Sequence, residues 1–239
     1  MSNSENVTIK NVENNSENGS TNHFAPKPYA IFDMDGTLVD SMAYWRDLAK
    51  EYLTSKGVTE GLSSIIEEIR TMTMTESAQL FVDTFSLEGT AESVADEMNE
   101  MMNNHYKTDI PLKKGGKEYI ELLYKKGVKM CVASATAEDL MEACLTRLGI
   151  AKYFEFLLSC ENVGAGKSKP DVYFESAKRR GAKAEDIAVY EDAIYAIETA
   201  KKAGFYVVGV YDEAEKKQDK VKELSDTYVY NYDDYLMQN

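Results

Sequence analysis

Long hydrophobic segments and an excess of basic residues are both missing from this 239-residue sequence. No apolar run approaches the ~20 residues of a membrane-spanning helix, and the first residues contain no apolar signal-peptide segment. Lys and Arg number 27 against 41 Asp and Glu, a net charge of −14 that argues against a basic nucleic-acid-binding or membrane-binding face. We therefore expect a cytoplasmic protein, a monomer, with neither nucleic acid nor membrane as partner.

Cysteine and histidine are also scarce. The cysteines Cys131, Cys144 and Cys160 form no CxxC pair, and none is followed six residues later by arginine. A zinc site, a dithiol redox site and a thiol-phosphatase loop are therefore not expected, and the three thiols are interpreted as buried and reduced. Only His23 and His105 are available for histidine chemistry, and the periodicity places His105 on an apolar stripe, as a packed core residue. We expect any catalysis to use carboxylates and a divalent cation.

Three kinds of segment follow one another along the chain. Residues 1–23 are rich in Asn, Ser and Glu, and we expect them to be a disordered tail. Residues 42–110 repeat their apolar side chains with helical period throughout, and they carry 13 acidic and 5 basic residues, a net charge of −8. They interrupt an α/β domain that we assign to residues 24–41 and 111–239. The sequence therefore predicts a core domain with an α-helical cap inserted after its first strand.

The core domain alternates apolar, strand-like runs with amphipathic helices. Such alternation is typical of an α/β fold with a doubly wound, mostly parallel, Rossmann-like sheet. The predicted helices are 138–148, 171–180 and 193–203. The predicted strands are 29–32, 128–133, 154–160, 187–190, 205–211 and 227–230.

Polar side chains follow several of these strands at the point where each strand ends. In an open α/β sheet, ligands bind beyond the carboxyl ends of the strands, so we expect these side chains to lie close together. Carboxylates crowded there select a hard cation such as Mg²⁺, and lysine and hydroxyl donors suit the phosphate that accompanies it. The residues are Asp33, Asp35, Ser134, Thr136, Lys167, Glu191 and Asp192. They predict Mg²⁺-assisted phosphoryl chemistry.

Four motifs, in this order, resemble those of the haloacid dehalogenase (HAD) superfamily. They are IFDMDGTLVDS at 31–41, the serine of ASAT, the lysine of GKSKPDVY and the acidic pair of YEDAIYAIETAKKAG. The resemblance covers roughly residues 29–239 and is strongest to the phosphatases and phosphomutases with a helical cap, which include β-phosphoglucomutase. It implies a small phosphorylated substrate, such as a sugar phosphate.

The resemblance also implies a role for each residue of the motifs. Asp33 is implied to be the nucleophile that forms an aspartyl-phosphate, and Asp35 the general acid and then base. The Asp33 carboxylate, the Asp35 backbone carbonyl and Asp192 are implied Mg²⁺ ligands, and Glu191 holds the metal directly or through another group. The implied phosphate-binding residues are Gly36, Thr37, Ser134, Thr136 and Lys167.

Some positions are open to two interpretations. Lys167 and Lys169 compete for the catalytic lysine, and aligning Pro170-Asp171 with the usual motif favours Lys167. Arg70 ends a cap helix, where it serves either a substrate contact or the helix terminus.

Several other residues near the motifs are interpreted as structural. Asp40 and Ser41 are interpreted as the hinge turn into the insert and the start of its first helix. Thr136 is interpreted as the cap of the helix that follows it, and Asp171 as the cap of another. Residues 161–168 nearly spell a nucleotide P-loop, but Glu161 replaces its first glycine and Pro170 disfavours a helix there.

Three functions remain possible on this motif set. Phosphomutases often carry Lys-Asn where this chain has Ala137-Glu138, and a glutamate would repel a second phosphate. Ala193 and Ala196 stand where serine and glycine are usual, which removes no metal ligand. These departures favour a phosphatase over a phosphomutase, and the intact Asp33 and Asp35 argue against a non-catalytic phosphometabolite-binding protein.

Overall fold

A computed structural model describes residues 26–69 and 72–236 of the chain. The predicted disordered tail and Arg70 lie outside these ranges. None of the helices within them is both long and apolar enough to cross a membrane.

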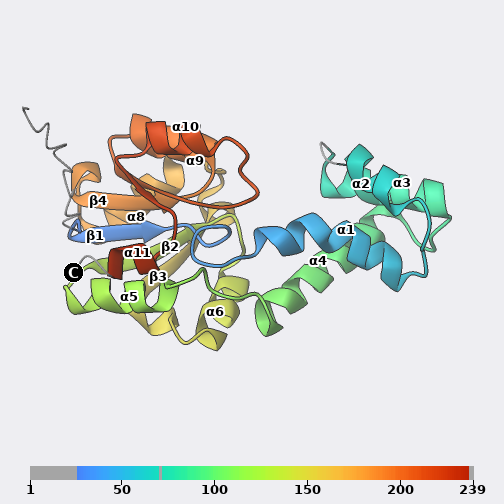
Figure 1. Cartoon of the computed structure of the whole chain (residues 1–239), viewed down its shortest axis with the longest axis horizontal. Coiled ribbons are helices and arrows are strands. Elements are labelled where there is room, and N and C mark those ends of the chain that lie inside the picture. Colours follow the sequence, from blue (N-terminus) through green and yellow to red (C-terminus); the bar gives the residue numbers. More distant parts are fainter. Residues whose placement is uncertain (1–25, 70–71, 237–239) are drawn as a thin grey trace, which may run out of the picture.

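Six parallel strands form a single sheet in the order β3-β2-β1-β4-β5-β6 (Figure 1). Ile31 of β1 pairs with Cys131 of β2 on one side and with Val189 of β4 on the other, so β1 lies in the middle of the sheet. The predicted α/β class and all six predicted strands are confirmed. The strands are β1 Tyr29–Phe32, β2 Lys129–Ser134, β3 Phe154–Ser159, β4 Ile187–Glu191, β5 Tyr206–Val210 and β6 Thr227–Val229.

Helices cover both faces of the sheet because successive strand residues point to opposite faces. Ala30 and Phe32 pack on the side of α5 and α6, whereas Ile31 packs on the side of α8, α9 and α10 (Figure 1). The helices α6, α8 and α9 match the predicted ones. The bounds are α5 Gly116–Lys125, α6 Glu138–Arg147, α7 Cys160–Val163, α8 Asp171–Arg180, α9 Ile194–Lys202, α10 Gln218–Leu224 and α11 Asp233–Leu236.

Helix α5 was not predicted from the sequence. It buries Tyr119, Ile120 and Leu123 on one face, but its short apolar stripe follows two glycines and two lysines that break the periodic pattern. Gly115 precedes the helix with a φ of +74°, a left-handed conformation that glycine adopts without steric cost.

Four helices form the insert, which projects from one end of the core (Figure 1). The two long helices α1 and α4 connect it to the core, and Thr73 and Thr90 cap α3 and α4 through reciprocal side-chain bonds. Its apolar residues continue the hydrophobic core on the α5–α6 side of the sheet. The helices are α1 Met42–Ser55, α2 Leu62–Glu68, α3 Met74–Phe85 and α4 Ala91–Thr108.

The two segments that connect the core to the insert pair with each other. The backbone N–H of Asp40 donates to Pro111 O at 2.9 Å, and the N–H of Lys113 donates to Leu38 O at 2.9 Å. Val39 and Leu112 lie opposite each other in an antiparallel bridge. Asp40 therefore lies in a paired crossing between core and insert, close to the end of β1.

Candidate active site

The carboxyl ends of β1 and β4 bring acidic residues together with one lysine. Asp33 directly follows β1, Glu191 ends β4 and Asp192 follows it. One carboxylate oxygen of each lies within 4.8 Å of the others, and all three side chains are buried. The ammonium group of Lys167 contacts Asp33 Oδ1 and lies 2.7 Å from Glu191 Oε1. The structure therefore places Lys167 in the cluster.

The alternative lysine, Lys169, is exposed to solvent, whereas Lys167 is buried against the carboxylates. Helix α8 begins at Asp171, so the near-P-loop segment does not lead straight into a helix as a nucleotide-binding loop would. Pro170 occupies the position before the helix and Asp171 is its first residue, so the prediction that Asp171 caps α8 was wrong.

Burial controls the electrostatics of this cluster. It raises the pKa of Asp33 to about 7, with the charges of Glu191 and Asp35 acting in the same direction and Lys167 opposing them. Burial, followed by the charges of Asp33 and Glu191, also raises the pKa of Asp192 well above its usual range. For Lys167, burial lowers the pKa, but the two adjacent carboxylates outweigh this effect and raise it. One lysine thus faces three buried carboxylates.

This excess of buried negative charge fits a divalent cation. The cluster offers only carboxylate oxygens, which are the ligands that Mg²⁺ prefers. Asp33, Glu191 and Asp192 are the residues that could hold the ion. A cation between them would offset the repulsion that now favours protonation of Asp33 and Asp192.

The loop after Asp33 depends on a glycine. Gly36 has a φ of +76°, and a Cβ atom at this position would clash with the Asp192 carboxylate. The hydroxyl of the next residue, Thr37, donates to Asp192 Oδ1 at 3.2 Å, and Tyr232 donates its hydroxyl to Thr37 O at 3.1 Å. Gly36 and Thr37 therefore hold the loop that directly follows Asp35 against Asp192.

Asp35 lies beside this cluster and accepts hydrogen bonds from four hydroxyls. Ser41 and Tyr106 both donate to its Oδ1 at 2.6 Å. Thr136 donates to Oδ2 at 2.6 Å, and Ser134 lies 3.5 Å from the same oxygen. The structure therefore brings both predicted hydroxyl residues, Ser134 and Thr136, to the side chain of Asp35.

Two of these contacts differ from the sequence prediction. Thr136 was predicted to cap α6, but Ala137 occupies the cap position and the Thr136 hydroxyl is turned toward Asp35. Ser41 was interpreted as part of the hinge turn and the start of a helix; it does occupy the cap position of α1, but its buried hydroxyl bonds the Asp35 carboxylate. Thr136 reaches a carboxylate 101 positions away and Ser41 one only six positions away, and in neither case does the periodic pattern of the sequence indicate the bond.

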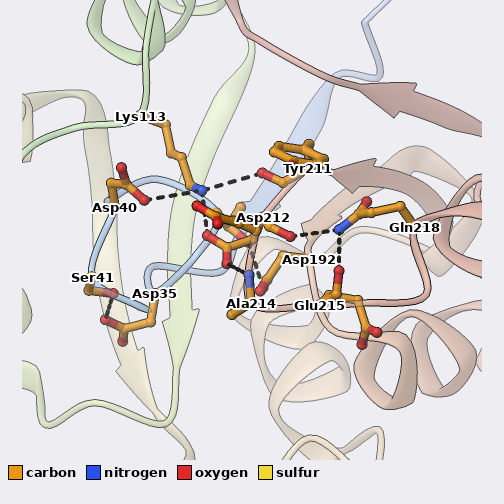
Figure 2. Close-up of polar contacts among 12 residues, drawn as sticks. Asp35, Asp40, Ser41, Lys113, Asp192, Tyr211, Asp212, Ala214, Glu215 and Gln218 are labelled. Atoms are coloured by element: carbon orange, nitrogen blue, oxygen red, sulfur yellow. Dashed lines mark hydrogen bonds and ion pairs between the residues drawn. The ribbon is translucent and has the colours of Figure 1, made fainter. Parts of the chain in front are cut away.

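A second buried ion pair lies at the end of β5. Asp212 is 2 % exposed and contacts the ammonium group of Lys113, which also lies 3.5 Å from Asp40 in the crossing segment. Figure 2 shows Lys113 between Asp40 and Asp212, with Asp35 and Ser41 below Asp40 in this view. Asp212 was not predicted from the sequence, although an acidic residue shortly after an apolar strand is the same signal that indicated Asp33.

His105 was predicted to be a packed, hydrogen-bonded core histidine; it is hydrogen-bonded, but it lies at the edge of the core on α4, with 13% of its side chain exposed. Its Nδ1 is 2.9 Å from Asp109 Oδ1, and its Nε2 is 3.0 Å from Glu51 Oε2. The apolar stripe of α4 instead continues through the next residue, Tyr106, which is buried.

Comparisons with known proteins agree with this architecture. Residues 30–210 match the model of the haloacid dehalogenase-like hydrolase family. The chain is 26% identical to a phosphorylated carbohydrates phosphatase from Thermotoga maritima, over 73% of this chain and 80% of the relative. It is 27% identical to the fructose-1-phosphate phosphatase YqaB from Escherichia coli, over 75% of this chain and 94% of that protein.

The fold is also similar to a crystal structure of a putative beta-phosphoglucomutase from Thermotoga maritima. The TM-score is 0.75 at 23% sequence identity, and the match covers 88% of this chain and 97% of the other. The family match spans most of the chain, including both β1 and β4, which carry the acidic cluster. The chain therefore belongs to the haloacid dehalogenase-like hydrolase family and groups with its phosphatases.

Proposed function

We propose that this protein is a Mg²⁺-dependent phosphatase that hydrolyses a small phosphorylated metabolite of the sugar-phosphate class through an aspartyl-phosphate at Asp33. The observation that carries the proposal is the buried Asp33 carboxylate, paired with Lys167 and clustered with Glu191 and Asp192. The names of the two curated relatives, both phosphatases of phosphorylated carbohydrates, support the substrate class.

In the first step, a carboxylate oxygen of Asp33 attacks the phosphorus atom and the bond to the leaving oxygen breaks. Asp35 gives its proton to that oxygen, so the alcohol leaves neutral. The Lys167 ammonium and the Ser134 hydroxyl hold the phosphoryl oxygens while negative charge redistributes over them. Asp33 is then covalently phosphorylated and Asp35 is a carboxylate.

In the second step, Asp35 takes a proton from a water molecule, whose oxygen attacks the phosphorus of the aspartyl-phosphate. The bond to Asp33 breaks, inorganic phosphate leaves and the Asp33 carboxylate is regenerated. Asp33, Asp192 and Glu191, with the Asp35 backbone carbonyl, would hold Mg²⁺. When bound, the ion supplies positive charge between these carboxylates and the phosphoryl oxygens.

The insert, residues 42–110, is proposed to be the cap that covers this site and contacts the rest of the substrate. The position of Glu138 favours hydrolysis over a phosphomutase reaction, in which the phosphoryl group is transferred to a hydroxyl of a substrate that already carries a phosphate. Its carboxylate accepts a bond from the N–H of Ser159 at 3.3 Å, at the carboxyl ends of β2 and β3, where it would repel a second phosphate group.

The test is phosphate release from a panel of sugar and small-metabolite phosphates, with Mg²⁺ and with a chelator. We expect release that needs Mg²⁺ and that Asp33→Asn abolishes, by about 10³-fold or more, because the nucleophile is removed. Asp83→Asn is the matched control, since Asp83 is exposed on α3, where it accepts a bond from Gln79 Nε2 at 3.0 Å. Full activity in Asp33→Asn, or isomerised product without free phosphate, would contradict the proposal.

A further inference from the structure

Tyr106 extends from the insert into the core site. It lies on α4, is 1 % exposed and donates its hydroxyl to Asp35 Oδ1 at 2.6 Å, although the two residues are 71 positions apart. The backbone carbonyl of Tyr106 accepts a bond from Arg147 Nε at 3.2 Å, and Arg147 belongs to α6 of the core. Both the side chain and the backbone of Tyr106 are therefore attached to the core domain.

The direction of the Tyr106 hydroxyl is set by Trp45. The indole Nε1 of Trp45 on α1, which can only donate, lies 3.1 Å from the Tyr106 oxygen. That oxygen therefore accepts from Trp45 and gives its own proton to Asp35.

The two oxygens of Asp35 are occupied unequally. Each carboxylate oxygen has two lone pairs, and those of Oδ1 are both used by short bonds from Ser41 and Tyr106. Oδ2 accepts one short bond, from Thr136, and a long contact of 3.5 Å from Ser134. The remaining acceptor capacity of Asp35 is thus on Oδ2, next to the hydroxyls at the end of β2.

We propose that Tyr106 is a positioning residue for the acid–base step: together with Ser41 it saturates Oδ1 of Asp35 and so presents Oδ2 for proton exchange with the leaving oxygen. The inference rests on the proposed phosphatase function. It means that the insert supplies part of the proton-transfer geometry, through α4. The proton given by Asp35 in the first step and the one taken from water in the second both pass through Oδ2.

The test compares two classes of substrate in Tyr106→Phe. Expulsion of an alkoxide from an alkyl phosphate needs the proton of Asp35, whereas 4-nitrophenolate leaves from 4-nitrophenyl phosphate without one. We expect kcat/KM for alkyl phosphates to fall about 10- to 100-fold, as for a misplaced acid, and kcat/KM for 4-nitrophenyl phosphate to change less than about threefold. Trp45→Phe should show the same selectivity with a smaller loss.

Tyr52→Phe is the matched control. Tyr52 is a buried tyrosine on α1 whose hydroxyl donates to Glu97 Oε2 of α4 at 2.7 Å, so the same change breaks a tyrosine-to-carboxylate bond within the insert and leaves Asp35 untouched. It should leave both substrate classes equally active. Trp45 is the only tryptophan of the chain, so its emission should shift in Tyr106→Phe and not in Tyr52→Phe.

The outcomes separate this proposal from the one on which it rests. A selective loss on alkyl phosphates supports the role of Tyr106. An equal loss on both classes, or no loss on either, overturns it while the wild-type enzyme remains a phosphatase. A wild-type protein that releases no phosphate from either class overturns the proposed function itself.

Discussion

Charged residues have different surroundings in the core and in the insert. In the core, Lys167, Asp33 and Glu191 form ion pairs whose side chains are at most 8 % exposed. In the insert, Lys56 and Glu97 form an ion pair of 2.6 Å whose side chains are 39 and 50 % exposed. Removing a charge from water costs several kcal/mol unless a partner compensates, so only the buried pairs are obligatory for folding. The net charge of the insert is therefore mostly a solvated surface.

The two regions also contribute differently to the candidate site. The core supplies carboxylates, a lysine and short hydroxyl side chains from its strand ends. The insert supplies no charged ligand among its described residues, but it contributes the neutral donors Tyr106 and Trp45. In the proposed mechanism, the core therefore supplies the reacting groups and the insert orients one of them. Three pairs of variants and one single variant sharpen or break this comparison.

The largest difference is expected between Lys167→Met and Lys56→Met. The first leaves Asp33 and Glu191 buried without a cation, which costs about 3–5 kcal/mol of unfolding free energy. The second removes an exposed pair and costs less than about 1 kcal/mol. Urea unfolding of both variants measures the difference, and equal losses would contradict the distinction between buried and exposed pairs.

Lys113→Met should have the next largest effect. Asp212 would remain buried without its ammonium partner, at a cost of about 3 kcal/mol. Adding Asp212→Asn should recover more than half of the loss, because no buried charge remains. The neighbouring Lys114, which is 73 % exposed in its pair with Asp233, is the control, and Lys114→Met should change stability by less than about 1 kcal/mol. A double variant as unstable as Lys113→Met would refute the pairing.

Gly36→Ala and Gly57→Ala test the same backbone strain in the two regions. Both glycines have a left-handed φ, +76° and +84°, so each alanine costs about 1–2 kcal/mol. Only the Cβ at Gly36 meets Asp192, whereas the Cβ at Gly57 meets nothing within 4 Å. Gly36→Ala should therefore also lower kcat/KM at least about tenfold, and Gly57→Ala should leave it unchanged. Equal kcat/KM values for the two variants, measured at temperatures equally far below their melting temperatures, would show that the contact with Asp192 is unimportant.

His105→Gln should have the smallest effect, visible only through pH. Burial lowers the pKa of His105, but the bonds to Asp109 and Glu51 outweigh it and raise the pKa above 6.5. A raised folded-state pKa stabilises the protein below pH 6.5, and this contribution is lost as the pH rises through the folded value. Both carboxylates are about half exposed, so we expect less than about 1 kcal/mol.

The measurement for His105 is the pH dependence of the melting temperature in wild type and His105→Gln. As the pH rises above 6.5, the melting temperature should fall less in the variant than in wild type. Parallel pH profiles would show that His105 contributes no pH-dependent stability.

Most of the fold was predictable because its signals are local. Each strand is a short apolar run, and the helices of the insert and α6, α8 and α9 carry clear periodic stripes. Helix α5 was not predicted because its apolar stripe is short. Asp171 was wrongly assigned as a helix cap because the exact first residue of a helix depends on backbone geometry that the sequence does not show. The candidate carboxylates were predictable since each follows a buried strand and the parallel sheet gathers the strand ends.

The sequence by itself determined the α/β class, the helical insert and the placement of Asp33, Lys167, Glu191 and Asp192 at one edge of the sheet. Only the tertiary structure decided which hydroxyls orient Asp35 and which lysine neutralises Asp212. Ser41, Thr136 and Tyr106 reach Asp35 from three different segments, and Lys113 reaches Asp212 across 99 positions. Periodicity shows which face of an element is buried, whereas these bonds depend on how separate elements pack together.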